Sequence, residues 1–187
     1  MNTFMAPRTE IRLAGEGGQG MILAGIILAE AASIYDNKMA VQTQSYGPEA
    51  RGGASKSEVV IADGEIDHPE VLSADVVVTL SQEAYDKYAA SVKPGGLLIV
   101  DDEKVSGVRQ ADAVRIPVNR LAFETTGRTI TANTVALGVL VALTGVVSRE
   151  AIAKAVAARA PRGTEEMNRK ALEAGFAAAE RVGKKRK

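Results

Sequence analysis

One stretch decides the fold of this chain: Ile11-Arg12-Leu13-Ala14-Gly15-Glu16-Gly17-Gly18-Gln19-Gly20-Met21-Ile22-Leu23. A short apolar segment precedes the glycines, and a second apolar segment opens at Met21. Gly15, Gly17 and Gly20 fit the spacing G-x-G-x-x-G, which is typical of a strand that turns sharply into a helix. The first backbone N–H groups of such a helix are free to bind an anion, and glycines allow another group to approach closely. We therefore expect a strand, a tight loop and a helix here.

Composition predicts a protein with an aliphatic core. The chain has 187 residues, of which 46% are hydrophobic and only 4% aromatic, with 23 basic and 23 acidic residues. This length predicts a single domain over residues 1–187, and the balanced charge gives no indication of a nucleic-acid partner. Because the sequence has no cysteine, the chain forms no disulfide and holds no cysteine-ligated zinc or iron–sulfur cluster. The basic run Lys184-Lys185-Arg186-Lys187 is expected to belong to a flexible tail, residues 183–187.

The apolar segments of the chain are short. Residues 1–10 lack the apolar core of a secretory signal, and the two most apolar stretches, 21–28 and 135–147, fall below the roughly 18 residues that span a bilayer. We therefore expect a soluble protein without a membrane partner, and the absence of cysteine favours the cytoplasm. Residues 135–147 are expected to form either core or a subunit interface.

The rest of the chain alternates between strand and helix patterns. A helix from residue 21 to about residue 35 and a strand over 40–45 complete a first β-α-β unit, which favours a parallel strand pair with a right-handed crossover. Further strands are expected at 57–61, 75–80, 97–100 and 114–118, and helices at 82–91, 120–126, 131–143, 149–159 and 165–182, with Ser81, Ser148 and Thr164 as N-caps. The pattern predicts a Rossmann-like α/β layered sandwich: a mostly parallel central sheet, flanking helices and a helical C-terminal third.

A second unusual stretch follows the strand at 40–45: Ser45-Tyr46-Gly47-Pro48-Glu49-Ala50-Arg51-Gly52-Gly53-Ala54-Ser55. We expect a structured loop at the carboxyl end of that strand, the edge where open α/β sheets bind ligands and partners. Arginine suits bidentate recognition of a carboxylate or phosphate. The pair Glu49 and Arg51 could stabilise the loop, position a substrate carboxylate or contact a partner, and the residues leave these alternatives open.

Two cofactor-dependent alternatives lack an expected residue. A dinucleotide site usually needs an acid at the end of the second strand, where this chain has Gln44-Ser45, and Asp36 precedes that strand. Lys93-Pro94-Gly95-Gly96 before an apolar strand is also found in methyltransferases, but a tight turn into a buried strand explains it equally well. His68 is the only histidine, and no G-x-S-x-G elbow is present, which disfavours a metal site or a catalytic triad. The residues favour a binding or assembly subunit over a self-contained enzyme.

The two glycine-rich stretches resemble those of the gamma subunit of 2-oxoacid:ferredoxin oxidoreductases. The resemblance rests on Gly15–Gly20, Gln42–Gly53, Ser55–Val59, Ser81–Tyr85 and Asn133 with Leu137-Gly138, and it extends from Glu10 to about Ala178. The tyrosine form of the second stretch is more similar to the 2-oxoglutarate branch than to the pyruvate branch. The alternative from a different class is a stand-alone nucleotide-binding protein of Rossmann type.

The resemblance implies an activity that belongs to a complex. Such a complex oxidatively decarboxylates a 2-oxoacid, transfers the acyl group to coenzyme A and passes two electrons to ferredoxin. Thiamine diphosphate, Mg²⁺ and iron–sulfur clusters are implied on other subunits, so this chain is expected to bind no cofactor or metal alone and to have no catalytic residue. Alpha, beta and ferredoxin-like delta subunits are the implied partners, with self-association of the isolated chain left open.

The same resemblance implies which residues face a cofactor or partner. They come from both glycine-rich stretches and are expected to lie together at the carboxyl edge of the sheet: Gly15, Gly17, Gly18, Gln19, Gly20, Ser45, Tyr46, Gly47, Pro48, Glu49, Arg51, Gly52 and Gly53.

Overall fold

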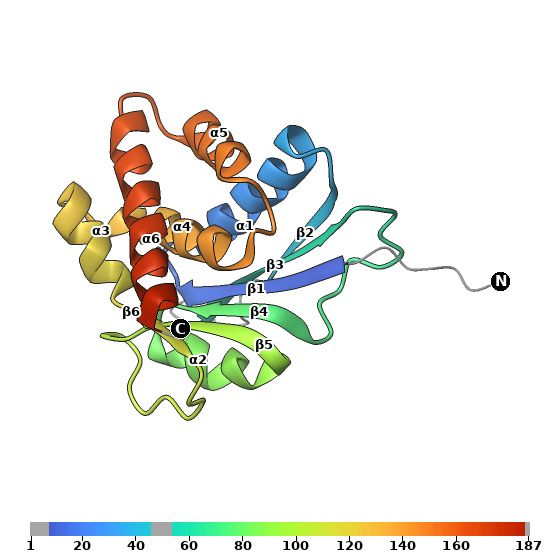
Figure 1. The fold of residues 1–187 in the computed structure, drawn as a ribbon, viewed down its shortest axis with the longest axis horizontal. Helices are drawn as coiled ribbons and strands as arrows, with labels where there is room; N and C mark the ends of the chain where they lie inside the picture. Colours follow the sequence, from blue (N-terminus) through green and yellow to red (C-terminus); the bar gives the residue numbers. More distant parts are fainter. Residues whose placement is uncertain (1–7, 46–53, 186–187) are drawn as a thin grey trace.

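The computed structural model describes residues 8–45 and 54–185 and contains one six-stranded sheet (Figure 1). Its strands are β1 (Arg8–Glu16), β2 (Met39–Ser45), β3 (Ala54–Ala62), β4 (Ala74–Thr79), β5 (Val92–Asp101) and β6 (Val114–Ile116), in the spatial order β2-β3-β1-β4-β5-β6. The helices are α1 (Met21–Glu30), α2 (Gln82–Tyr88), α3 (Val118–Thr126), α4 (Ala132–Thr144), α5 (Arg149–Arg159) and α6 (Glu165–Lys185). A π-helical turn, η1 (Ala31–Tyr35), extends α1, and short 3₁₀ turns occupy η2 (Ala89–Ser91) and η3 (Thr129–Thr131). No described helix is long and apolar enough to cross a bilayer.

The sheet is mostly parallel, as the sequence predicts, with β3 as its antiparallel member. The predicted pairing of the first two strands is wrong. Strand β3 lies between β1 and β2 and pairs antiparallel with both, so β1 and β2 run in the same direction without touching. Strands β2 and β3 follow one another in the chain and pair antiparallel, and this local pairing displaces the β1–β2 contact that the β-α-β pattern favours.

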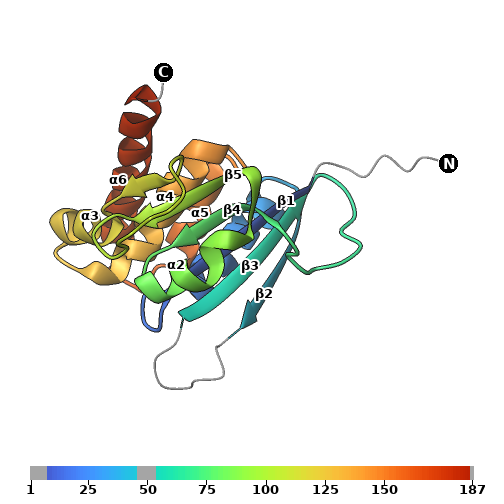
Figure 2. The same cartoon turned by 90° about the horizontal axis from the view of Figure 1, so that it is seen from below.

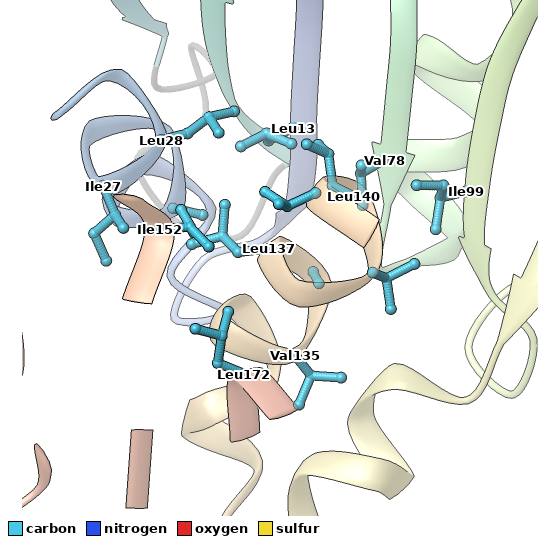
Figure 3. Close-up of a cluster of buried hydrophobic side chains, with 14 of the residues drawn as sticks. Leu13, Ile27, Leu28, Val78, Ile99, Val135, Leu137, Leu140, Ile152 and Leu172 are labelled. Atoms are coloured by element: carbon cyan, nitrogen blue, oxygen red, sulfur yellow. The ribbon is translucent and has the colours of Figure 1, made fainter. Parts of the chain in front are cut away.

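Helices cover the two faces of the sheet unequally. Figures 1 and 2 show α1, α3, α4, α5 and α6 on one face and α2 on the other. On the first face, Leu13, Val78 and Ile99 of the strands meet Leu137 and Leu140 of α4 (Figure 3). All ten residues from Ala132 to Val141 are buried, as are Val146 and Val147, so most of the apolar stretch 135–147 is core, while residues 142–144 are partly buried and Gly145 is exposed.

Helix α4 crosses α6 at a pair of glycines. A Cβ placed on Gly138 would lie 2.4 Å from the carbonyl oxygen of Leu172, and one on Gly175 would lie 2.2 Å from the carbonyl oxygen of Val135. Both obstacles are backbone atoms, which cannot rotate away as a side chain can. The two helices therefore pack backbone to backbone, and only glycine fits at either position.

Several predicted boundaries are confirmed and others are wrong. Ser81 and Ser148 cap α2 and α5 through their hydroxyl groups, which accept from the N–H groups of Ala84 (3.2 Å) and Ala151 (3.0 Å). Helix α2 ends at Tyr88, β5 begins at Val92 and includes the Lys93–Gly96 segment, and Val118 opens α3 rather than ending β6. Helix α6 continues to Lys185, so it includes part of the segment 183–187 that was expected to be a tail.

Candidate functional site

The glycine loop lies where the connections that follow two neighbouring strands pass to opposite faces of the sheet. From β1 the chain passes to α1 on one face, and from β4 it passes to α2 on the other. The carboxyl ends of β1 and β4 are adjacent, because Ala14 pairs with Thr79. In open α/β sheets the crevice between two such strands is the usual ligand site. The glycine loop, residues 17–20, closes directly over this crevice.

The crevice is occupied by the side chain of Gln19. Its amide nitrogen donates to the carbonyl oxygen of Leu80 (3.1 Å), and its amide oxygen accepts from the N–H of Glu16 (2.8 Å). A Cβ on Gly15 would lie 2.4 Å from that same amide oxygen. A side chain at position 15 would therefore displace Gln19 from its present place, where it satisfies backbone groups that a bound phosphate or ribose would otherwise meet.

The space beside Gly20 is likewise occupied by another side chain of the same protein. Its φ of +73° is left-handed, and a Cβ there would lie 2.7 Å from the amide nitrogen of Asn133 at the start of α4. The Asn133 amide oxygen accepts from the N–H of Thr134 (2.8 Å) and its nitrogen faces the carbonyl oxygen of Gly20 (3.4 Å). Asn133 therefore ties the glycine loop to α4, a role that its position in the sequence does not indicate.

The exposed part of the loop borders an open, mostly apolar hollow of about 380 Å³. Gly17 and Gly18 have open space where a Cβ would be, so external groups can approach the backbone there. The hollow is also lined by Gly20, the first turns of α1 (Met21, Ile22, Leu23, Ile26) and Ser55. Leu23 is 38% exposed. This surface suits an apolar contact better than a charged phosphate chain.

The second glycine-rich stretch is described only at its ends. Tyr46, Gly47, Pro48, Glu49, Arg51, Gly52 and Gly53 lie outside the described residues. Ser45 is exposed at the end of β2, and its register partner on β3 is Lys56. Ser55, which follows the stretch, pairs with Gly15 in register, and its hydroxyl donates to the carbonyl oxygen of Gly15 (3.2 Å). Both ends of the stretch therefore lie at the sheet edge that carries the glycine loop.

Asp36 and His68, the two ionisable residues considered above for a cofactor or metal, are not placed to serve such a site. Asp36 accepts from the N–H (2.5 Å) and the hydroxyl group (2.7 Å) of Ser148, which fixes η1 to the start of α5 rather than leaving a carboxylate for a ribose. His68 is exposed in the β3–β4 loop, at the sheet edge opposite the glycine loop. No group of three or more His, Asp or Glu within residues 8–45 and 54–185 is placed to hold a metal ion.

Asp101 is a buried carboxylate at the carboxyl end of β5, on the sheet edge that carries the glycine loop. It was not predicted from the sequence. One of its oxygens accepts from the N–H groups of Glu103 (3.0 Å) and Lys104 (3.1 Å), and the other from the backbone and side-chain N–H groups of Asn119 (both 2.8 Å). Four donors from the same chain occupy this carboxylate, so it anchors the turn after β5 and the start of α3. Its position directly after the apolar run Leu97–Val100 is the sequence feature that could have indicated this carboxylate.

A buried ion pair beneath α2 was also missed. Arg12 of β1 and Glu58 of β3 are register partners with an N–O contact of 2.5 Å, and Lys56 contacts the same carboxylate at 3.0 Å. The Arg12 guanidinium also donates to the Val71 carbonyl oxygen (2.9 Å) and lies 5.8 Å from the centre of the Tyr88 ring. Opposite charges on neighbouring strands could have indicated this pair, but only after β3 had been assigned beside β1.

Fold and site together define a Rossmann-like α/β protein whose glycine loop is completed by its own side chains. Comparison with known proteins gives the same class. The family model described as pyruvate ferredoxin/flavodoxin oxidoreductase matches residues 10–178, and the chain belongs to this family.

Individual relatives are similar over nearly their whole length. The 2-oxoglutarate synthase subunit KorC of Methanocaldococcus jannaschii is 52% identical over 179 residues, which cover 94% of this chain and 96% of the relative. The crystal structure of the keto/oxoacid ferredoxin oxidoreductase gamma subunit from Geobacter sulfurreducens has a TM-score of 0.87 at 53% identity and covers 94% of this chain and 98% of that one. The predicted resemblance to the gamma subunit, and to its 2-oxoglutarate branch, is confirmed.

A more distant structure shares the fold alone. The 2-oxoglutarate:ferredoxin oxidoreductase from Magnetococcus marinus superimposes with a TM-score of 0.81 at 23% identity and covers 93% of this chain but only 31% of that longer chain. The same α/β unit is therefore also found as one part of a larger polypeptide.

Proposed function

We propose that this chain is the gamma subunit of a cytoplasmic 2-oxoglutarate:ferredoxin oxidoreductase, in which it acts as one domain that assembles with other subunits and completes their site. The observation that carries the proposal is the 52% identity, over almost the full length of both chains, to a protein named as a subunit of 2-oxoglutarate synthase. The subunits expected beside it are alpha, beta and a ferredoxin-like delta.

The proposed reaction needs groups that this chain is poorly suited to supply. Oxidative decarboxylation of 2-oxoglutarate releases CO₂, transfers the succinyl group to coenzyme A and delivers two electrons to ferredoxin. Thiamine diphosphate with Mg²⁺ supplies the carbon chemistry in such complexes, and iron–sulfur clusters accept the electrons. The chain has no cysteine for a cluster, and among its described residues neither Asp36 nor Asp101 has a carboxylate free of partners in the chain. These features favour a non-catalytic subunit.

The glycine-rich stretches would serve as contact surfaces in this proposal. Gln19 and Asn133 fill the positions nearest the sheet, which argues against a tightly held dinucleotide in the crevice. The exposed Gly17 and Gly18, the apolar start of α1 and the ends of the second stretch remain accessible. They would pack against the thiamine-binding subunits or frame the entrance for coenzyme A or the 2-oxoacid, with Tyr46, Glu49 and Arg51 giving specific contacts.

Co-purification from the native cell tests the assembly. A tagged chain is expected to recover thiamine-binding and ferredoxin-like subunits in a fixed ratio, and the purified complex should reduce ferredoxin in a reaction that depends on both 2-oxoglutarate and coenzyme A. Faster turnover with pyruvate would change the substrate assignment alone. Recovery of the chain by itself with a bound nucleotide would contradict the proposal and support the stand-alone nucleotide-binding protein instead.

Arg51→Ala tests the second glycine-rich stretch within the reconstituted complex. We expect weaker assembly or lower turnover, with Arg162→Ala as the control, because Arg162 is an exposed arginine in the α5–α6 connection. If Arg51→Ala leaves both assembly and turnover at the wild-type level, the contact role of this stretch is wrong even where the complex itself is confirmed.

A further inference from the structure

A second hollow, of about 290 Å³, lies away from the glycine loop, at the β6 edge of the sheet. Strands β4 and β5 separate this edge from β1. The hollow is formed by β6 and the start of α3 on one side and by the C-terminal part of α6 on the other, and its lining includes Arg115, Arg120, Leu121, Glu124, Arg181 and Val182. The proposed contact role of the glycine-rich stretches does not involve it.

Positive charge in this hollow is only partly neutralised within the chain. Arg120 contacts Glu103 (2.6 Å) and Glu124 (3.7 Å), which leaves little of its charge unpaired. Arg115 donates to a neutral backbone oxygen, that of Val108 (3.3 Å), and has no ion pair recorded with a carboxylate among residues 8–45 and 54–185. Arg181 is exposed and makes no ion pair with any residue in the described part of the chain. Within the described residues, these two guanidinium groups therefore have no recorded ion pair.

The sequence continues beyond Arg181 with further basic residues. Helix α6 continues past Arg181 to Lys185, and the sequence closes with Lys184-Lys185-Arg186-Lys187. Figure 2 shows the C-terminal end of α6 projecting from the body of the molecule. A chain with zero formal net charge thus places basic residues close together in the sequence at the end of α6, a composition that suits an electrostatic docking surface.

Apolar groups lie between these cations. Leu121 and Val182 line the hollow together with Ile116. A purely electrostatic surface, such as one that follows a nucleic-acid backbone, does not need apolar side chains at its centre, whereas protein interfaces combine an apolar centre with a polar rim.

We propose that this hollow docks an acidic segment of a partner polypeptide in the assembled enzyme. Apolar side chains of that segment would pack on Leu121 and Val182, and its carboxylates would pair with Arg115 and Arg181, whose planar guanidinium groups suit bidentate carboxylate binding. The inference rests on the proposed function, because it requires a partner subunit, but it concerns a different surface from the glycine-rich stretches.

Zero-length cross-linking of the purified complex tests the docking directly. A carbodiimide joins carboxylates to amines, so Lys184 and Lys185 are expected to become linked to Asp or Glu residues clustered in one segment of one partner subunit. The double variant Arg115→Glu/Arg181→Glu should lose that subunit at lower salt and bind it about tenfold more weakly, since charge reversal adds repulsion to the lost attraction. Arg162→Glu, which reverses an exposed charge at the other end of α6, should assemble as the wild type does.

The outcomes separate this inference from the proposed function. If the complex forms but the double variant keeps wild-type stoichiometry and salt resistance, the docking surface is wrong and the function stands. If the wild-type chain assembles with no partner subunit, both are overturned. If a labelled single-stranded DNA binds the wild-type chain and not the double variant, while assembly is unaffected, the hollow recognises nucleic acid instead. A circular dichroism spectrum equal to that of the wild type establishes that the variants fold.

Discussion

At the scale of single residues, Gln19 determines what the glycine loop can do. One flexible side chain satisfies both the N–H of Glu16 and the carbonyl of Leu80, which belong to adjacent segments of the crevice. A bound ligand would have to displace these hydrogen bonds and replace them. The loop is therefore built to hold its shape without a ligand, as expected of a surface that contacts another subunit.

Replacing Gln19 by alanine should destabilise the isolated chain. Loss of both hydrogen bonds leaves the Leu80 carbonyl unsatisfied, so we expect the free energy of unfolding to fall by about 1–3 kcal/mol. Urea denaturation followed by circular dichroism measures the change. Gln44→Ala, at an exposed position on β2, is the control and should stay within about 0.5 kcal/mol of the wild type. Equal losses in the two variants would show that Gln19 does not brace the crevice.

The residue-level predictions from sequence were accurate where the determinant is local. The strand, glycine loop and helix around Gly15–Gly20 follow from apolar pattern and backbone freedom, and Ser81 and Ser148 act as caps because a cap depends on the next few residues. The partner of Gly20 was not predictable, since Asn133 is 113 positions away along the chain. Which group fills the space left by a glycine depends on tertiary packing.

At the scale of elements, the α4–α6 crossing fixes the helical layer to the sheet. Helix α4 is buried along most of its length, so its position depends on how closely α6 can approach. The contact through Gly138 and Gly175 leaves no room for even one methyl group. An error of a few tenths of an ångström at this crossing would propagate to Leu137 and Leu140 in the core.

Alanine at either glycine of the crossing should therefore be destabilising despite its higher helix propensity. For Gly138→Ala and for Gly175→Ala we expect a loss of about 1–3 kcal/mol, because a backbone carbonyl must move. The matched control is Gly183→Ala, also in α6 but with open space around the new Cβ, which should gain up to about 1 kcal/mol. Thermal denaturation of the three variants measures the contrast, and a stabilised Gly175→Ala protein would contradict the close crossing.

An exposed ion-pair network on α6 gives a prediction about pH. Hydrogen bonds from Arg169, at 2.6 and 2.8 Å, lower the pKa of the Glu166 carboxyl group below its ordinary value. Because the folded pKa is depressed, the pair contributes stability above the unfolded pKa of Glu166 and loses it as the pH falls through the folded pKa. An NMR titration should show the Glu166 pKa rising in Arg169→Ala. An unchanged titration would mean that the pair does not persist in solution.

The strand order shows where sequence reasoning reaches its limit at this scale. Apolar runs predicted β4 and β5, because a strand that is buried on both faces is apolar at nearly every position. The insertion of β3 between β1 and β2 was not predictable, because period-2 patterns do not specify which strands become neighbours. The Lys93–Gly96 segment lies within the bounds of β5, but it is an irregularity between the paired residues Val92 and Leu97, and Gly95 there has the left-handed φ of +77° that suits a tight turn.

At the scale of the whole molecule, α6 holds the rest of the helical layer in place. It packs against α3, α4 and α5, and Leu172 joins the main core (Figure 3). Deleting residues 165–187 should therefore expose Val135 and its neighbours and abolish the cooperative thermal transition, with increased binding of an apolar dye. Deleting only residues 184–187 should leave the transition within a few degrees of the wild type. A cooperative transition in the larger deletion would contradict the structural role of α6 in the main core.

The central place of β1 has a consequence for how the protein is made. Strand β1 leaves the ribosome first, yet both of its neighbours, β3 and β4, and the helix α4 that covers Leu13 come later in the chain. At about 5–20 residues per second, the residues between β1 and α4 take roughly 6–25 s to synthesise. Strands β3 and β4 can pair with β1 before that interval ends, but throughout it Leu13 lacks the cover of α4. Nascent chains of this protein should therefore need shielding by a chaperone until translation has passed α4.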